Sequence, residues 1–156
     1  MASSVGIGFD AHRFADGIPL MLGTIDIDHP RGLAGHSDGD VLTHAVVDAI
    51  LGAMGGEDIG TRFPSSDPQW RGASSRGFLE EVVAEARSNG FAIVNIDATV
   101  ICEEPRIEPY REKIRDALLD ATGASRVNIK ATTTDGMGFT GRGEGIAAIT
   151  VALLDG

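Results

Sequence analysis

The stretch VGIGFDAH, residues 5–12, decides the fold that we expect for this chain. Its first, third and fifth residues are apolar, and this period of two is the spacing of a half-buried β-strand. The two glycines, Asp10 and His12 then share the other side, and the strand is expected to end near Asp10. A carboxylate and an imidazole at this spacing could supply half of a tetrahedral zinc site. An Asp and a His at a strand end are more often an ordinary surface pair, so this pattern alone does not establish a metal site.

A second stretch, GHSDGDVLTH at residues 35–44, bears on the same question. Asp40, His44 and Asp48 follow one another at intervals of four and share one face of a predicted helix. One interpretation is a solvated face with an Asp–His pair. The other makes His44 a third metal ligand, which leaves one open position and suits a catalytic metal. Asp48 could then orient the helix or a ring nitrogen.

A third stretch, KATTTDGMGFTGRGEG at residues 130–145, combines threonines, one carboxylate and many glycines. Hydroxyl groups and backbone N–H groups of this kind can bind phosphate oxygens. The stretch lacks the Gly-Lys-Ser/Thr of a P-loop and the strand-to-helix glycine pattern of a dinucleotide-binding fold. By itself it indicates either a phosphate contact or a flexible turn.

Length and composition narrow the class of protein. The 156 residues suit one domain, residues 1–156, and the net charge of −10 argues against nucleic acid and against an anionic membrane surface as partners. The single Cys102 cannot form an intramolecular disulfide, and no signal peptide is recognised, so a cytoplasmic protein is expected. Cys102 is interpreted as a small strand residue whose pKa Glu103 and Glu104 raise, rather than as a nucleophile.

The rest of the chain is expected to alternate strands and helices. Val94, Ile96 and Ala98 are predicted to share one side of the clearest strand. The elements expected are a hairpin over 19–28 around Gly23, a helix from Ser37 or Asp38 as N-cap to Met54 with a stop at Gly55-Gly56, a loop over 62–70, a helix from the Ser74-Ser75 cap to Asn89-Gly90, a strand over 91–102, a helix over 109–122, a strand over 127–131 and a last strand over 146–154. This order predicts an α+β two-layer sandwich, a mixed sheet with helices on one face. The uncovered apolar face predicts self-association.

Four motifs taken together resemble the 2-C-methyl-D-erythritol 2,4-cyclodiphosphate synthases, in order and over essentially the whole chain. They are GFDAHRF (8–14), GHSDGDVLTHAVVDAILGA (35–53), DIG with RFPSSDPQW (58–70) and KATTTDGMGFTGRGEGIAA (130–148). The resemblance implies a phosphorus–oxygen lyase of the non-mevalonate isoprenoid pathway. Such an enzyme converts 4-diphosphocytidyl-2-C-methyl-D-erythritol 2-phosphate into the 2,4-cyclodiphosphate by attack of the 2-phosphate on the β-phosphate, releasing CMP. It also implies a homotrimer with sheets packed around a threefold axis, active sites between subunits, and an apolar central cavity that could hold an isoprenoid diphosphate.

The resemblance assigns roles to individual residues. Asp10, His12 and His44 correspond to the zinc ligands, and the first two also contact substrate. His36 and Thr133 correspond to the catalytic residues that stabilise the transition state. The other substrate-binding residues implied are Ser37, Asp58, Ile59, Gly60, Phe63, Pro64, Ser65, Ser66 and Asp67 around the methylerythritol phosphate, Cys102, Glu103, Glu104, Pro105, Arg106, Ile107 and Glu108 around the cytosine, Lys130, Thr132, Thr134 and Asp135 beside the CDP, and Phe139 and Arg142.

Two places depart from the family pattern. Asp135 stands where the family often has Glu, the residue associated with a second cation, Mg²⁺ or Mn²⁺, that bridges the diphosphate. Its side chain is one methylene shorter, so direct ligation stays open. Glu103 and Glu104 are unusually acidic for a diphosphate pocket, and we expect both side chains to point to solvent. Arg142 and Glu144 resemble a charged ring at one end of the central cavity.

The residues themselves are compatible with phosphoryl transfer that needs no protein nucleophile, because no Ser–His–Asp or Cys–His set is recognised. Two other classes of protein remain as alternatives. A metal-dependent phosphohydrolase would use the same ligands with a metal-bound water and yield only linear products. A non-catalytic trimeric module would bind an isoprenoid in the uncovered apolar face and have no turnover.

Overall fold

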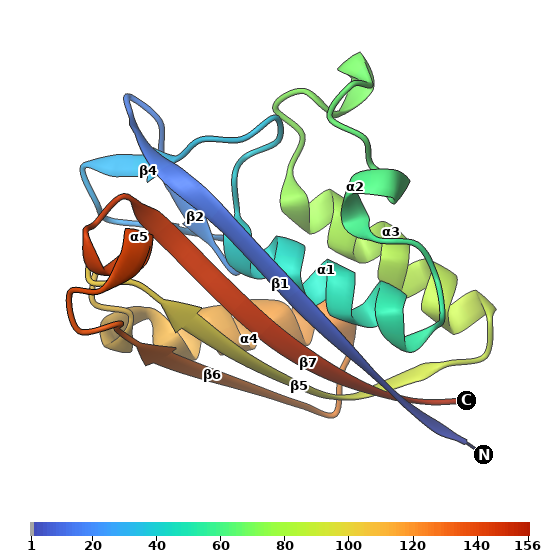
Figure 1. The fold of residues 1–156 in the computed structure, drawn as a ribbon. Helices are drawn as coiled ribbons and strands as arrows, with labels where there is room; N and C mark the ends of the chain where they lie inside the picture. Colours follow the sequence, from blue (N-terminus) through green and yellow to red (C-terminus); the bar gives the residue numbers. More distant parts are fainter. Residues whose placement is uncertain (1) are drawn as a thin grey trace.

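The computed structural model describes residues 2–156. Its sheet has the strand order β4-β1-β7-β5-β6, and a separate two-stranded ribbon is formed by β2 and β3 (Figure 1). The elements are β1 (Ser3–Asp16), β2 (Leu20–Leu22), β3 (Ile25–Ile27), β4 (Arg31–Leu33), α1 (Val41–Ala53), α2 (Ile59–Arg62), η1 (Pro68–Trp70), α3 (Ser75–Ser88), β5 (Ala92–Ile101), η2 (Glu108–Tyr110), α4 (Arg111–Thr122), β6 (Arg126–Thr132), α5 (Gly138–Gly141) and β7 (Gly145–Asp155).

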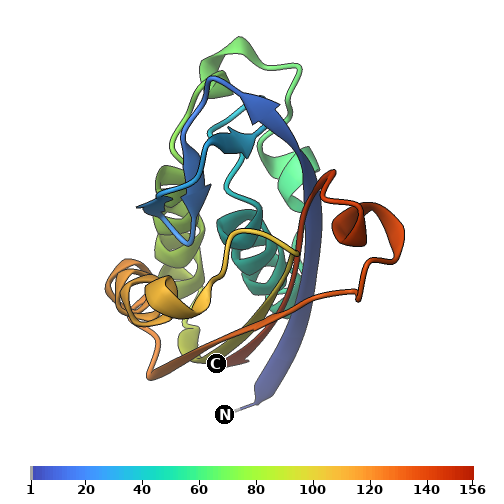
Figure 2. The same cartoon turned by 90° about the vertical axis from the view of Figure 1, so that its left-hand side faces the viewer.

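The layers agree with the α+β sandwich expected from the sequence. The sheet is mixed, because β6 runs parallel to β5 whereas the other neighbouring strands are antiparallel. Seen along its edge, the curved sheet has α1, α3 and α4 on one side and only the short α5 on the other (Figure 2). The helices therefore cover one face and leave most of the other uncovered.

The first strand is longer than predicted, and this changes the setting of the site. β1 pairs with β7 from Ser3 to Arg13 and then with β4 from Phe14 to Asp16. The expectation that the strand ends near Asp10 is therefore wrong, because β7 and then β4 continue to satisfy its backbone hydrogen bonds. Asp10 and His12 lie within a rigid strand rather than at a free end.

The glycines of β1 allow α1 to pack directly on the strand. A Cβ at Gly8 would lie 1.9 Å from the carbonyl oxygen of Ala45, and one at Gly6 would lie 1.8 Å from that of Ala49. Only a residue without a side chain fits so close to a helix backbone. The predicted common side of Gly6, Gly8, Asp10 and His12 is thus the side that faces α1.

The start of α1 differs from the prediction of Ser37 or Asp38 as N-cap. Asp40 is the N-cap, and its side chain accepts a hydrogen bond from Thr43 N at 3.0 Å. It also accepts from Gly23 N and Thr24 N in the turn of the β2–β3 hairpin, which confirms a hairpin around Gly23. Burial raises the pKa of the Asp40 carboxyl despite these donors. A buried acceptor thus ties the hairpin to the helix.

Smaller differences lie elsewhere in the chain. A bulge between Ile93 and Asn95 breaks the alternation of β5, so Val94 does not share the buried side of Ile96. The helix expected over 109–122 starts at Arg111, after the separate turn η2. Short helices not foreseen in the sequence are α2, which ends within the expected loop over 62–70, η1 in the same loop, and α5 in the glycine-rich stretch.

The uncovered face of the sheet is apolar along β1 and β7. Val5, Ile7 and Phe9 are 65%, 68% and 58% exposed, and their register partners on β7 include the exposed Val151 and Ile149. The apolar period of the opening stretch therefore points away from the helices. None of the helices among residues 2–156 has the length and apolar composition of a membrane span.

Candidate metal centre and adjoining pockets

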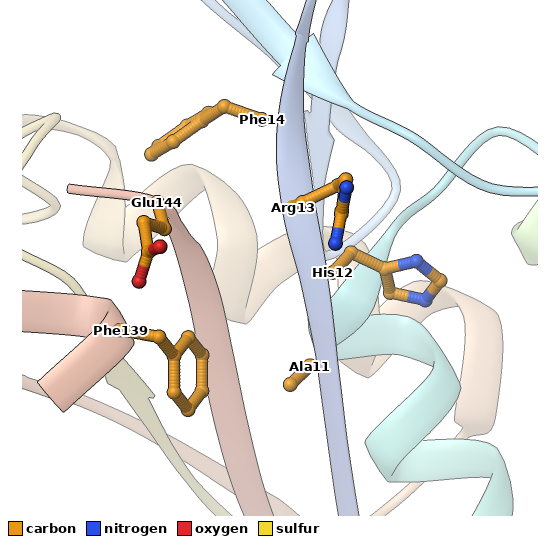
Figure 3. Close-up of a pocket in the computed structure, with 6 residues that line it drawn as sticks. All are labelled: Ala11, His12, Arg13, Phe14, Phe139 and Glu144. Carbon is orange, nitrogen blue, oxygen red and sulfur yellow. The ribbon is translucent and has the colours of Figure 1, made fainter.

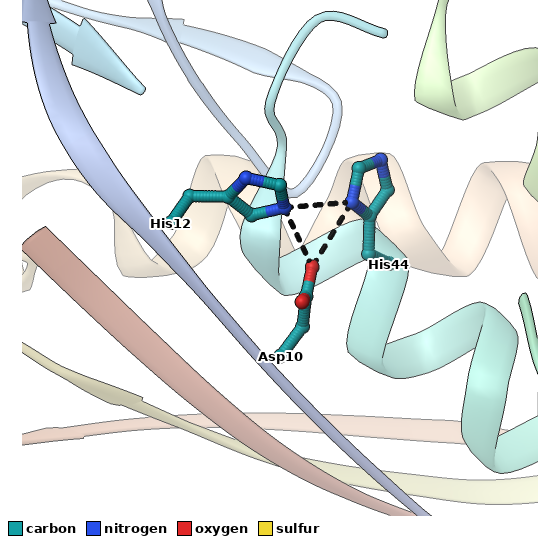
Figure 4. Close-up of side chains that lie close together, drawn as sticks. All are labelled: Asp10, His12 and His44. Atoms are coloured by element: carbon teal, nitrogen blue, oxygen red, sulfur yellow. Dashed lines mark hydrogen bonds and ion pairs between the residues drawn. The ribbon is translucent and has the colours of Figure 1, made fainter. Parts of the chain in front are cut away.

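Three side chains from two elements meet between β1 and α1 (Figure 4). Asp10 Oδ2 lies 2.8 Å from His12 Nε2 and 3.0 Å from His44 Nδ1, and the two ring nitrogens are 3.2 Å apart. β1 supplies the aspartate and the first histidine, and α1 supplies His44, which is only 7% exposed. The alternative of a solvated helix face is therefore wrong for His44, because α1 packs that face against β1.

The charges of this triad stabilise one another. Burial alone would raise the pKa of Asp10, but hydrogen-bond and charge interactions with His12 and His44 outweigh it and hold the pKa well below its usual value. Burial alone would lower the pKa of His12, but the hydrogen bond and charge of Asp10 raise it above 6.5. The carboxylate is thus anionic at neutral pH, and a proton on His12 is favoured when no metal is bound.

The donor set has the geometry of a small metal site. All three ligand atoms lie within 4.8 Å of one another, so the group could hold a metal ion. Tetrahedral zinc with bonds of about 2.0–2.1 Å separates its ligand atoms by roughly 3.3–3.4 Å, only a few tenths of an ångström more than the distances here. His12 Nδ1 lies 2.7 Å from the carbonyl of Ala34, which can accept its proton and leave Nε2 free for a metal.

The residues around His44 differ from those predicted. Its Nε2 lies 2.8 Å from Ser75 Oγ and 3.1 Å from Ser37 Oγ. The expectation that Asp48 orients the imidazole is not met, because Asp48 Oδ1 accepts a hydrogen bond from Ile59 N at 3.0 Å. Asp48 instead connects α1 to the start of α2, one turn of helix further along.

A pocket of about 230 Å³ opens beside the triad, and it brings together most of the residues predicted around the methylerythritol phosphate. Phe63, Trp70 and Phe78 form an aromatic wall, with Phe63 and Phe78 stacked at 4.4 Å and Trp70 edge-on to both. Sequence reasoning missed Trp70 and Phe78, whose only signal was aromatic character near the loop. The predicted residues that line this metal pocket are Asp10, His12, His36, Ser37, His44, Ile59, Gly60, Phe63 and Ser65.

Other residues in the segment between α1 and α3 do not line the pocket, and some of them instead fix the conformation of this segment. Asp58 is exposed and caps α2 by accepting a hydrogen bond from Thr61 N at 2.7 Å. The side chain and then the backbone N–H of Thr61 lower the pKa of this carboxyl. Asp67 caps η1, and its carbonyl oxygen lies 3.2 Å from His36 Nε2. Pro64 and Ser66 lie in the same loop, outside the residues that line the pocket.

A second pocket, of about 440 Å³, gathers the residues predicted around the cytosine. Burial, and then the charge of Glu103, raises the pKa of Cys102 to about 11, which agrees with an unreactive thiol. The expectation of a strand residue is wrong by one position, because β5 ends at Ile101. Glu104 is exposed as expected, but Glu103 lines the pocket and its carboxylate accepts from Gly136 N at 3.4 Å. The predicted residues here are Cys102, Glu103, Pro105, Arg106, Ile107, Glu108, Lys130, Thr132 and Thr133, joined by Arg111 and Ala131.

The segment Thr132–Asp135 does not meet the metal triad within one chain. It begins at Thr132, the last residue of β6, and β6 is the third strand beyond β1 in the sheet, so at least roughly 14 Å of sheet separates the two groups. Thr133 and Asp135 are exposed, and their side chains contact each other at 3.3 Å. Thr134 turns inward instead, bonding to Thr140 Oγ1 at 2.7 Å. Two groups of predicted residues are therefore present as separate half-sites.

A third hollow, of about 590 Å³, lies where β1 meets the loop before β7. Phe139 and Glu144 lie on one side of β1 there, whereas His12 points the other way, toward α1 (Figure 3). Arg142 and Glu144, the residues that resemble a charged ring, form an ion pair with Nη2 and Oε2 2.8 Å apart. Phe139 is exposed in this hollow, away from the metal pocket.

Comparisons with known proteins place this geometry in context. The family model described as the YgbB family matches residues 3–155. The chain is 53% identical, over 99% of its length, to a protein of Sphingopyxis alaskensis named bifunctional enzyme IspD/IspF, of which it spans only 40%. It is 52% identical to the 2-C-methyl-D-erythritol 2,4-cyclodiphosphate synthase of Alkalilimnicola ehrlichii, with 96% of this chain and 93% of that protein covered. A structure of a synthase of that name, in a CDP-bound form, superposes with a TM-score of 0.88 at 34% identity over 97% of this chain and 99% of that one.

Proposed function

This chain belongs to the YgbB family, and on this premise we propose that it converts 4-diphosphocytidyl-2-C-methyl-D-erythritol 2-phosphate into 2-C-methyl-D-erythritol 2,4-cyclodiphosphate and CMP. The observation that carries the proposal is the convergence of Asp10, His12 and His44 beside a pocket whose wall contains His36 and Ser37. The separate spans of β1 and α1 that supply them are the ones whose motifs resemble the synthases. A location in the cytoplasm stays a prediction of the sequence.

The proposed reaction is an intramolecular phosphoryl transfer. An oxygen of the 2-phosphate forms a bond to the β-phosphorus, and the bond from that phosphorus to the bridging oxygen breaks, so CMP leaves with the electron pair. The substrate supplies its own nucleophile, and the protein has to hold the two ends in line. Such positioning can contribute up to about 7–11 kcal/mol in favourable intramolecular systems.

Residues of this chain can do that positioning from two sides. His36 and Ser37 would hold the 2-phosphate in the metal pocket, and His36 would stabilise negative charge as it develops. Lys130 and Thr133 would hold the CDP portion, with the cytosine against residues 102–108. The aromatic wall excludes water from the reacting end, which disfavours hydrolysis to a linear product.

We propose that Asp10, His12 and His44 hold Zn²⁺ and that Asp135 contributes to a second site for Mg²⁺ or Mn²⁺. When bound, the two cations would withdraw negative charge from the diphosphate oxygens as Lewis acids. Two histidines and one carboxylate are a donor set that zinc accepts, whereas a single exposed carboxylate suits a hard cation shared with phosphate oxygens. An acidic chain of net charge −10 could thereby bind a multiply anionic substrate.

We also propose that the active site is complete only in a homotrimer. The metal pocket and the CDP half-site lie apart on one chain, and the face formed by β1 and β7 exposes five large apolar side chains. Packing that face around a threefold axis would bury it and could bring the two half-sites of adjacent subunits together. The Arg142–Glu144 pair would then form a charged ring suited to the head of an isoprenoid diphosphate whose tail enters the central cavity.

Incubation with the cytidylylated substrate, followed by ³¹P NMR, tests the proposed reaction. The expected products are a cyclic diphosphate and CMP in equal amounts. A linear diphosphate or inorganic phosphate would instead indicate a metal-dependent phosphohydrolase. Absence of turnover by zinc-loaded, folded protein that still binds an isoprenoid diphosphate would favour a non-catalytic binding module.

Two measurements test the assembly. Sedimentation should report about 49 kDa, three times the 16.3 kDa chain, and a monomer at micromolar concentration would contradict the shared site. Co-expression of differently tagged His44→Ala and Thr133→Ala chains should restore activity that neither has alone. If each site takes its metal triad from one subunit and its Thr133 from the next, random mixing leaves both groups intact in about a quarter of the sites. No recovery in purified mixed trimers would mean that each site lies within one chain.

A further inference from the structure

A hydrogen-bonded chain leads from His44 to a carboxylate outside the metal triad. His44 Nε2 lies 2.8 Å from Ser75 Oγ, and Ser75 Oγ in turn contacts Asp38 Oδ1. Two backbone groups also donate to this carboxylate: Ser75 N to Oδ2 and Asp40 N to Oδ1, each at 3.0 Å. Ser75 is fully buried at the start of α3, and Asp38 precedes α1. These hydrogen bonds therefore link the starts of two helices beside the triad.

The chemistry of these groups gives the hydrogen bonds a direction. An ionised carboxylate only accepts, and a hydroxyl has one proton to donate. The proton of Ser75 Oγ is therefore directed to Asp38, and Ser75 can face His44 only as an acceptor. Nε2 of His44 must then carry a proton, and in the neutral ring Nδ1 presents a lone pair to Asp10 and His12.

We propose that Asp38, acting through Ser75, holds His44 in the Nε2–H tautomer and so makes Nδ1 the metal-binding atom. Asp10 Oδ2, 3.0 Å from Nδ1, would favour the opposite tautomer in the metal-free protein, and the Asp38–Ser75 pair opposes it. Both are positioning residues, since neither lines the metal pocket. Ser37 Oγ lies 3.1 Å from Nε2 and can accept a bifurcated hydrogen bond from the same Nε2–H group. The hydroxyl proton of Ser37 then stays available to a ligand in the pocket. The inference rests on the metal site of the proposed function.

Two variants test this inference without substrate. Asp38→Asn keeps the size of the side chain and an oxygen for Ser75 N, but its amide can donate to Ser75 Oγ. The serine proton can then turn to His44 Nε2, which favours the wrong tautomer. Ser75→Ala removes the acceptor altogether. The matched control is Ser74→Ala, because the Ser74 side chain makes no capping hydrogen bond.

The measurements are long-range ¹H–¹⁵N spectra of the imidazoles in metal-free protein and zinc affinity by competition with a chromophoric chelator. We expect wild-type and Ser74→Ala protein to have His44 mainly as Nε2–H. In Asp38→Asn and Ser75→Ala this population should fall and zinc affinity should drop about 10–100-fold, the range known for partners of metal-bound histidines. Thermal melts by circular dichroism identify variants that are folded.

Three results would overturn the inference: a wild-type His44 that is mainly Nδ1–H, zinc affinity within threefold of wild type in both folded variants, or a loss of affinity with no change of tautomer. The first needs no variant, so an unfolded substitution cannot leave the question open. A wild-type protein that binds zinc but does not cyclise the substrate would count against the proposed reaction and leave the tautomer result standing.

Discussion

The metal triad and the Thr132–Asp135 segment both contain predicted functional residues. Other parts of the same chain pack around the triad but leave Thr133 and Asp135 exposed. His44 is buried and contacts Asp10, His12 and Ser75, whereas Thr133 and Asp135 are exposed and contact mainly each other. Buried polar groups are held by fixed partners, and exposed ones can adapt to a ligand or another subunit. The first half-site is therefore preorganised by this fold, and the second acquires its partners on assembly in our proposal.

The largest effect is expected from His44→Ala. If Zn²⁺ binding contributes about 10–16 kcal/mol and three protein ligands share it, the loss of one should weaken binding by roughly 300- to 8,000-fold. The protein should remain folded, because Val41, Leu42 and Ala45 keep the apolar face of α1. Metal analysis by mass spectrometry and sedimentation provide the two readouts. A full zinc complement in this variant would contradict the three-ligand assignment.

His36→Ala should separate catalysis from nucleotide binding. His36 lines the metal pocket and is absent from the residues around the second pocket. Removal of one group that stabilises transition-state charge typically lowers kcat by about 10²–10³-fold, whereas CMP affinity should stay within about threefold. Steady-state kinetics and isothermal titration with CMP measure the two quantities. An equal loss of kcat and of CMP affinity would mean that His36 contacts the nucleotide. The two half-sites would then not have the separate roles proposed here.

Zinc affinity should decrease as the pH falls, by about tenfold per unit below the raised pKa of His12. The pKa of His12 lies above 6.5 in the metal-free protein, so a proton on Nε2 competes with the metal below that pKa and not above it. Asp10 adds no proton near neutrality, because its pKa is lowered. Asp10→Asn removes the charge that raises the His12 pKa. The pH below which zinc affinity begins to fall should therefore be lower in this variant. An affinity independent of pH between 5 and 8 would contradict this competition.

The smallest effect is expected from Asp135→Ala, which alters the exposed half-site. If Asp135 helps to hold the second cation, the Mg²⁺ concentration for half-maximal activity should rise about tenfold. Zinc affinity should stay within about twofold, because two strands, β7 and β5, lie between β6 and β1. Asp135→Glu, which adds the missing methylene, should lower the Mg²⁺ requirement below that of wild type. An unchanged requirement in both variants would remove Asp135 from the cation site.

Sequence reasoning failed where a local pattern had an unforeseen partner. Ser37 or Asp38 was a reasonable N-cap, but Asp38 bonds to Ser75, 37 residues away, and Asp40 caps α1 instead. In the same way β1 continues past Asp10 because β7 and then β4 pair with it. Phe78 fits the apolar period of α3 and Trp70 ends the short turn η1, but neither local pattern shows that their rings meet at the metal pocket.

The sequence by itself determined the alternation of strands and helices, the apolar face of β1 and the residue types that can bind a metal. These follow from short periods and from the chemistry of single side chains, which neighbours in the chain are enough to set. Only the tertiary structure decided that His44 meets residues 32 and 34 positions earlier, since this depends on α1 lying against Gly6 and Gly8. It also decided that Thr133 and Asp135 stay apart from that metal centre, because β6 takes the far edge of the sheet. Strand order arises from packing of the whole chain, and no local pattern encodes it.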